Sequence, residues 1–171
     1  MLNVEQVVTQ RFPGFFDDKP ALFTRPFLTL LRMLFYEKEI NRFLDEQRSV
    51  RGIDFVEKVL EYFDFDYRVP SSEIENIPSQ GRVIIVANHP LGALDALSLI
   101  QMVFRVRKDV KVLANDLLMS LQPLSDMLLP VDNMGGRSPK ESIKKIHAAL
   151  EQEQAVIVFP AGEVSRLRPN G

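Results

Sequence analysis

The sequence contains no cysteine, and this absence excludes several kinds of chemistry at once. A chain without thiols forms no disulfide, offers no thiolate ligand to zinc and has no cysteine nucleophile. The absence also fits a reducing compartment such as the cytosol. Only two histidines are present, His89 and His147. Their positions are therefore more informative than those of a common residue.

Long apolar runs are also missing. No stretch approaches the roughly 18–20 uninterrupted apolar residues that cross a bilayer. The N-terminus lacks the basic-then-apolar pattern of a secretory signal, because Glu5 and Gln6 follow almost at once. We therefore expect a protein that is soluble or peripheral to a membrane, and not integral.

Charge of one sign does not dominate the chain. There are 21 Lys and Arg against 23 Asp and Glu, which gives a formal net charge of −2. This balance argues against a broad basic surface for nucleic acid. With 171 residues, 46% of them hydrophobic, the chain is long enough for one globular domain with a substantial core.

The N-terminal part has helical periodicity. Between Pro26 and Asp45, apolar residues recur at spacings of three and four, at Phe27, Leu30, Leu31, Leu34, Phe35, Ile40 and Phe43. Arginine and lysine residues accompany this stripe. Two interpretations remain open: the helix covers the core, or its apolar face lies in a membrane interface. A second helix is expected from Gly52 to Phe63, followed by a short strand at 65–69.

After Gly81 the pattern alternates between strand and helix. Expected strands lie at 82–87, 110–114, 129–131 and 155–159, and expected helices at 95–106, 116–128 and 138–152. Such alternation is typical of an α/β fold with a largely parallel sheet flanked by helices. We divide the chain into an N-terminal helical region, 1–70, and an α/β domain, 71–171. Because the sequence stops just after a strand and a glycine turn, we expect it to be a truncated part of a longer protein.

The first strand of the α/β domain ends in Asn88 and His89, and Asp95 follows where the next helix begins. The carboxyl ends of buried strands are where α/β proteins place their chemistry. A neutral imidazole accepts a proton from a hydroxyl or amine, and a nearby carboxylate orients the ring. We interpret His89 as a general base and Asp95 as its orienting carboxylate. The alternative is a loop histidine beside a helix N-terminal charge.

Other active-site chemistry finds less support. An Asn-His pair also occurs in dinuclear metal hydrolases, but His147 lies in a lysine-rich segment, so we expect no metal site. The Gly-x-Ser-x-Gly elbow of serine hydrolases is missing, as are the glycine patterns of nucleotide-binding loops. Two segments do suit an anion: Arg137 before the helix at 138–152, and the loop Phe159–Arg166 with its backbone N–H groups.

In their order along the chain, three blocks resemble the glycerolipid (lysophospholipid) acyltransferases, the family that includes 1-acylglycerol-3-phosphate acyltransferase. The blocks are Asn88–Asp95, Pro130–Asp132 with Arg137, and Phe159–Arg166. The resemblance covers roughly residues 80–171. It differs from the commonest family pattern in having five residues between His89 and Asp95, and Ala161 in place of a glutamate. Both variants resemble a bacterial subgroup labelled hemolysin-like, related to acyltransferases of ornithine-lipid synthesis.

This resemblance implies acyl transfer from an acyl-carrier-protein or acyl-CoA thioester to a hydroxyl or amine of a lipid precursor. It implies catalysis by His89 and Asp95 without a bound cofactor. It further implies substrate binding by Asn88, Arg137, Gly162, Glu163 and Arg166, with Asn88 shaping the loop.

We also expect a cytoplasmic location at the inner face of the cell membrane. The competing prediction is a non-catalytic, membrane-associated (hemolysin-like) protein on the same scaffold, favoured if His89 and Asp95 lie beyond hydrogen-bond reach with no cleft beside them. The oligomeric state is left open.

Overall fold

The computed structural model describes residues 3–12, 14–16, 20–114, 116–119, 121–130 and 139–160. The chain forms two compact units, Met1–Ser49 and Val50–Gly171. None of the helices within the described ranges is long and apolar enough to cross a membrane.

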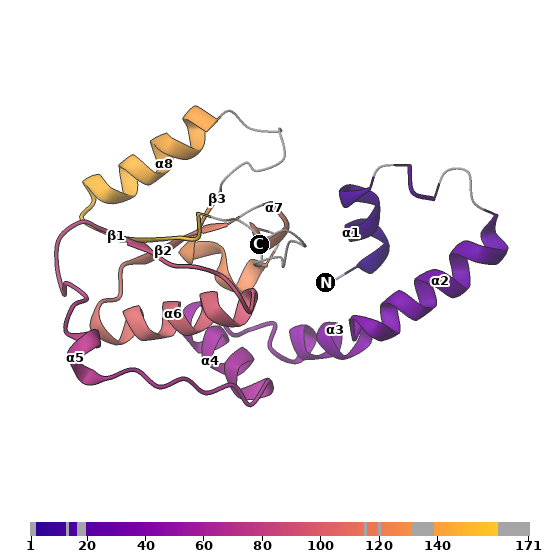
Figure 1. Ribbon diagram of the computed structural model, residues 1–171, viewed down its shortest axis with the longest axis horizontal. Helices are drawn as coiled ribbons and strands as arrows, with labels where there is room; N and C mark the ends of the chain where they lie inside the picture. Colours follow the sequence, from indigo (N-terminus) through magenta and orange to yellow (C-terminus); the bar gives the residue numbers. More distant parts are fainter. Residues whose placement is uncertain are drawn as a thin grey trace, which may run out of the picture. The chain divides into compact units, whose positions relative to one another are not determined.

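The described part of the N-terminal unit is helical (Figure 1). Its helices are α1 (Val4–Arg11), α2 (Ala21–Leu34) and α3 (Glu37–Glu46). The expected single helix from Pro26 to Asp45 is wrong in two respects. Helix α2 begins earlier, because the carbonyl of Pro20 accepts the N–H groups of Phe23 and Thr24. It is then separated from α3 at Tyr36, whose φ of 50° is left-handed and interrupts the helical path.

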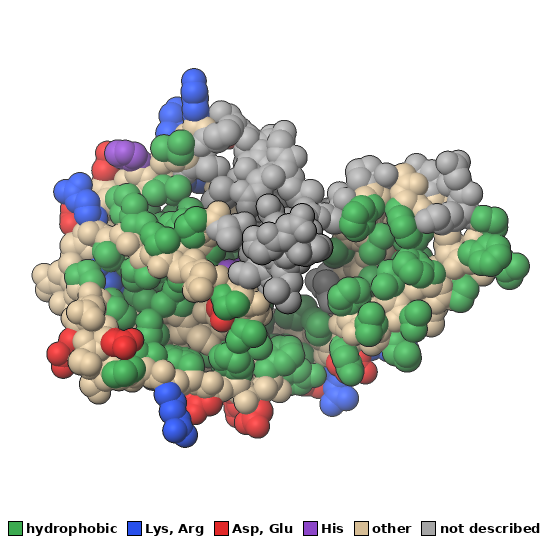
Figure 2. Space-filling view, viewed as in Figure 1, with side chains coloured by type: hydrophobic (Ala, Val, Ile, Leu, Met, Phe, Trp, Pro, Cys, Tyr) green, Lys and Arg blue, Asp and Glu red, His purple; other side chains and the backbone are tan. Residues whose placement is uncertain are grey.

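Polar contacts hold α1 to the other two helices. The Val4 N–H donates to the Glu37 carboxylate at 2.9 Å, and Arg32 pairs with Glu5 at 3.0 Å. Several apolar side chains of α2 remain exposed despite this packing: Leu22 at 80%, Phe23 at 69%, Leu30 at 55% and Met33 at 71%. Figure 2 shows that hydrophobic side chains, in green, gather over the helices of this unit. The outward face of this helix is therefore largely apolar.

The second unit contains a four-stranded parallel sheet, which confirms the predicted fold class. Its strands are β1 (Val83–Val86), β2 (Val110–Ala114), β3 (Leu128–Pro130) and β4 (Ala155–Val158), in the spatial order β1-β4-β2-β3. The last strand in the sequence therefore lies between the first two. This insertion brings the end of β4 beside the end of β1.

Helices cover both faces of the sheet (Figure 1). The described helices of this unit are α4 (Gly52–Tyr62), α5 (Ser71–Ile74), α6 (Ala93–Val106), α7 (Asp116–Met119) and α8 (Pro139–Glu151), with the 3₁₀ helix η1 (Gln122–Met127). The β1-to-β2 and β3-to-β4 connections run in opposite directions along the sheet. Because crossovers between parallel strands are right-handed, α6 and α8 lie on opposite faces.

The core lies mainly between the sheet and the layer formed by helices α6 and α4. Its largest fully buried side chains are Ile100, Ile157, Val56, Val103 and Val156. Fully burying an aliphatic side chain of this size contributes about 1.5–3 kcal/mol. Edge strand β1 is less well covered, since Ile84 and Val86 are 50% and 64% exposed. Strand β1 is therefore the less covered side of the sheet.

Two predicted segments differ from the structure. Residues 65–69 form no strand; the Tyr67 hydroxyl instead donates to Gln101 of α6 at 3.0 Å. The expected helix at 116–128 is split into α7 and η1, with Pro123 in the first turn of η1. The two compact units divide the chain between Ser49 and Val50, and α4 packs against α6 and η1 within the second unit. The division of the chain at residue 70 stays a prediction.

Candidate active site

His89 lies in the loop that leads from β1 into α6. The Ala87 N–H donates to the Val158 carbonyl at 3.1 Å, so the pairing of β1 with β4 continues almost to the histidine. The loop ends at Gly92, whose φ of 70° and ψ of −130° are readily adopted only by glycine. Helix α6 then begins and places Asp95 in its first turn. Local backbone geometry therefore directs both predicted catalytic residues to the carboxyl edge of the sheet.

The two side chains are neighbours without a hydrogen bond. His89 Nδ1 lies 4.0 Å from Asp95 Oδ2, and the two side chains are 17% and 21% exposed. The same Oδ2 accepts the Leu91 N–H at 2.5 Å, so Asp95 also closes the loop. Nδ1 is buried and has no hydrogen-bond partner among the described residues. A shift of about 1 Å would bring Nδ1 and Oδ2 to hydrogen-bond distance.

An aromatic contact completes the surroundings of His89. Phe159 directly follows β4, and its ring centroid lies 4.5 Å from that of the imidazole, with 35° between the ring planes. Phe159 is part of the predicted block Phe159–Arg166, but no catalytic or binding role was predicted for it. The pairing of Val86 with Val158 explains the contact, because the residues after two paired parallel strands emerge side by side.

The structure describes one of the five remaining predicted site residues. Asn88 is exposed in the loop before His89. Arg137, Gly162, Glu163 and Arg166 lie outside the described residues. Within the described ranges, no group of three or more His, Asp or Glu side chains is arranged to hold a metal ion. The described site therefore consists of His89, Asp95, Leu91 and Phe159.

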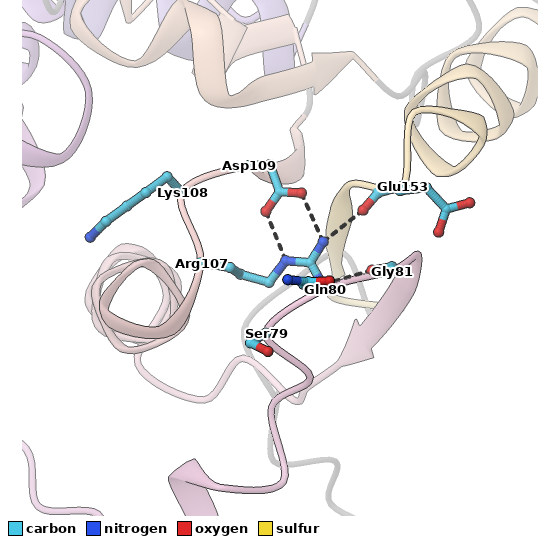
Figure 3. A pocket seen from close by; sticks show the side chains of 7 residues that line it. All are labelled: Ser79, Gln80, Gly81, Arg107, Lys108, Asp109 and Glu153. Carbon is cyan, nitrogen blue, oxygen red and sulfur yellow. Dashed lines mark hydrogen bonds and ion pairs between the residues drawn. The ribbon is translucent and has the colours of Figure 1, made fainter.

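A cavity of about 780 Å³ lies at the opposite, amino edge of the sheet (Figure 3). Its central feature is Arg107, which is only 4% exposed. The guanidinium donates to the Asp109 carboxylate at 2.7 and 2.8 Å and to three backbone carbonyls, those of Pro78, Gly81 and Glu153. These bonds use all five guanidinium N–H groups.

Arg107 therefore has a structural role. Its hydrogen bonds lower the pKa of the Asp109 carboxyl below its ordinary value, and the Asp109 carboxylate raises the pKa of Arg107. The carbonyls that it holds belong to the segments leading into β1 and β4, and Asp109 leads into β2. With no donor left for a ligand, this arginine joins the amino ends of three strands.

The comparisons with known proteins agree with the resemblance to lipid acyltransferases. The family described as Acyltransferase matches residues 7–170, and the chain belongs to this family. A lyso-glycine lipid O-acyltransferase of Bacteroides thetaiotaomicron is 33% identical over 172 residues, covering 100% of this chain and 60% of the relative. A protein of the same name from Phocaeicola vulgatus is 32% identical over 140 residues, covering 81% of this chain and 49% of the relative.

The chain thus spans about half to three fifths of the length of these relatives. No solved structure matches it.

Proposed function

We propose that the full-length protein transfers a fatty acyl group from an acyl-carrier-protein or CoA thioester to a hydroxyl of a lyso-lipid. The observation that carries this proposal is His89 at the carboxyl end of β1, with Asp95 on the Nδ1 side of its ring. Family membership and the two relatives, both named lyso-glycine lipid O-acyltransferase, support the reaction type. Their names favour a hydroxyl acceptor over an amine.

The chemistry needs one base and no covalent acyl-enzyme. Since Nδ1 faces Asp95, Nε2 is the ring atom that takes the acceptor's proton. The acceptor oxygen attacks the thioester carbonyl, the C–S bond breaks, and the imidazolium returns its proton to the departing thiolate. The nearby carboxylate favours the imidazolium while it exists. Arg137, Gly162 and Arg166 are proposed to position an anionic head group or the phosphopantetheine arm of the donor, and Glu163 is a further proposed substrate-binding residue.

Replacement of His89 tests this proposal. In the full-length protein, His89→Ala should lower acyl transfer to a lyso-glycine lipid by about 10²–10⁴-fold, the usual contribution of a general base. His147→Ala is the matched control, because His147 is the other histidine of the given sequence and is exposed on α8. Transfer by folded His89→Ala at a near-normal rate would remove the base assignment.

One observation favours the competing, non-catalytic function: the 4.0 Å between His89 and Asp95 exceeds a hydrogen bond. The same assay separates the two functions. If the unmodified full-length protein transfers no acyl group from either donor, while its fold is intact, the non-catalytic function is favoured.

We further propose that α2 brings the protein to a membrane surface. Its exposed apolar side chains, which include Phe23, Leu30 and Met33, form an apolar face suited to the boundary between head groups and acyl chains. A lipid acceptor that resides in the bilayer requires such an approach. The cytoplasmic side of the cell membrane is the proposed location, since acyl-CoA and acyl-carrier protein are cytoplasmic donors.

A further inference from the structure

The aromatic contact on His89 arises from the order of the strands. Strands β1 and β4 pair in parallel with Val86 opposite Val158. The Ala87 N–H still donates to Val158, so the backbones remain paired beyond the last residue of β1. Phe159 is the first residue after β4, and its ring therefore faces the imidazole at 4.5 Å.

Among the residues that the structure describes, no other contact fixes the plane of the imidazole. Asp95 is beyond hydrogen-bond distance, and Nδ1 has no partner among the described residues. The ring torsion of histidine has a broad energy profile, so the ring needs a neighbour to define its orientation. The half-buried Phe159 ring is such a neighbour on one face of the imidazole.

We propose that Phe159 is a positioning residue for His89, an inference that rests on the proposed acyl transfer. Its ring limits rotation of the imidazole and keeps Nε2 directed at the acceptor hydroxyl. Its π face also attracts the imidazolium that forms when His89 takes the proton. Both effects act on the chemical step, and neither requires Phe159 to touch the substrate.

Replacement of the ring by an aliphatic side chain should therefore lower kcat and leave KM unchanged. A desolvated cation–π contact corresponds to roughly a 5- to 30-fold change in rate. We expect this loss in full-length Phe159→Leu, with lyso-glycine lipid as acceptor and a saturating thioester donor. Phe159→Tyr keeps the aromatic face and should retain most of kcat.

Phe65→Leu is the matched control, since Phe65 is another half-buried phenylalanine of the same compact unit. It should leave kcat unchanged. If Phe159→Leu unfolds, Phe159→Met serves as the second aliphatic variant. A kcat of wild-type size in a folded aliphatic variant, or an equal loss in Phe159→Tyr, would overturn the inference.

A proton NMR measurement tests the contact independently of turnover. The chain has two histidines, and the aromatic ring current of Phe159 should shift the Cε1 proton of His89 but not that of His147. Phe159→Leu should move the His89 signal alone. An unmoved signal rejects the positioning role even if the protein is an active acyltransferase. Absence of acyl transfer in the unmodified protein would overturn the proposed function and, with it, this role.

Discussion

Asp95→Asn tests the central electrostatic step, because it removes the charge of Asp95 and little else. An asparagine oxygen can still accept the Leu91 N–H, so the loop should keep its closure. The negative charge that lies 4.0 Å from His89 Nδ1 is lost. The variant therefore separates two roles of the Asp95 carboxylate: closure of the loop and stabilisation of the imidazolium.

The separation sets the size of the effect. Two unit charges 4 Å apart attract by about 4 kcal/mol at an effective dielectric constant of 20, and by about 1 kcal/mol in bulk water. The side chains are only 17% and 21% exposed, which places the pair closer to the first limit. Since 1.36 kcal/mol is tenfold in rate, we expect kcat to fall by roughly 10²–10³-fold.

The assay is steady-state acyl transfer by the full-length variant, with circular dichroism and thermal unfolding to establish its fold. Asp54→Asn is the matched control, because Asp54 lies in the first turn of α4 as Asp95 does in α6. It removes a comparable helix-terminal charge with no bearing on His89. A folded Asp95→Asn enzyme within about threefold of wild type, or an equal loss in the control, would refute the electrostatic role.

Three further predictions concern stability and membrane binding. Arg107→Met removes the donor to three backbone carbonyls and breaks an ion pair in which Arg107 is buried but Asp109 is 41% exposed. It should cost about 1–3 kcal/mol, which calorimetry should record as a fall in Tm of roughly 2–12 °C. Hydrogen bonds from Arg107 lower the pKa of Asp109 in the folded protein. The stability that these bonds contribute is therefore fully present above the ordinary carboxyl pKa, and it is lost as the pH falls through the lower pKa of the folded state. In urea unfolding, Asp109→Asn should therefore lose less stability than wild type between about pH 5 and pH 3. Combined replacement of Phe23, Leu30 and Met33 by serine should weaken binding to lipid vesicles at least about tenfold, as measured by sedimentation of the protein with the vesicles. Ile143→Ser should leave this binding unchanged.

Strands β2 and β4 were predictable because they are largely buried and rich in β-branched residues. The pattern at 110–114 coincides with β2, and the starts of β4 and α4 were also located. The break at Tyr36 was not predictable, since the apolar stripe continues across it and a non-glycine residue adopts the left-handed conformation. The alternation at 65–69 was misleading for another reason. A strand needs a partner, and Tyr67 finds a helix side chain instead.

The candidate site was predictable in its chemistry but not in its distances. The sequence placed His89 after a strand and Asp95 at a helix start, and both lie there. The competition of Leu91 for the Asp95 carboxylate depends on loop geometry that spacing does not fix. The Phe159 contact depends on β4 lying beside β1. Strand order could not be predicted from periodicity, because an alternating pattern of strands and helices predicts a parallel sheet without specifying which strands are neighbours.

The two edges of the sheet differ in how far their polar groups are satisfied. At the amino edge, Arg107 uses every donor to join the segments that lead into β1 and β4. At the carboxyl edge, the same two strands deliver His89 and Phe159, and Nδ1 is left without a partner among the described residues. A one-residue slip between β1 and β4 would reverse the faces of one strand and move Phe159 away from the imidazole. Arg107, whose hydrogen bonds join the amino ends of these strands, opposes such a slip. It therefore helps to hold the His89 ring against Phe159.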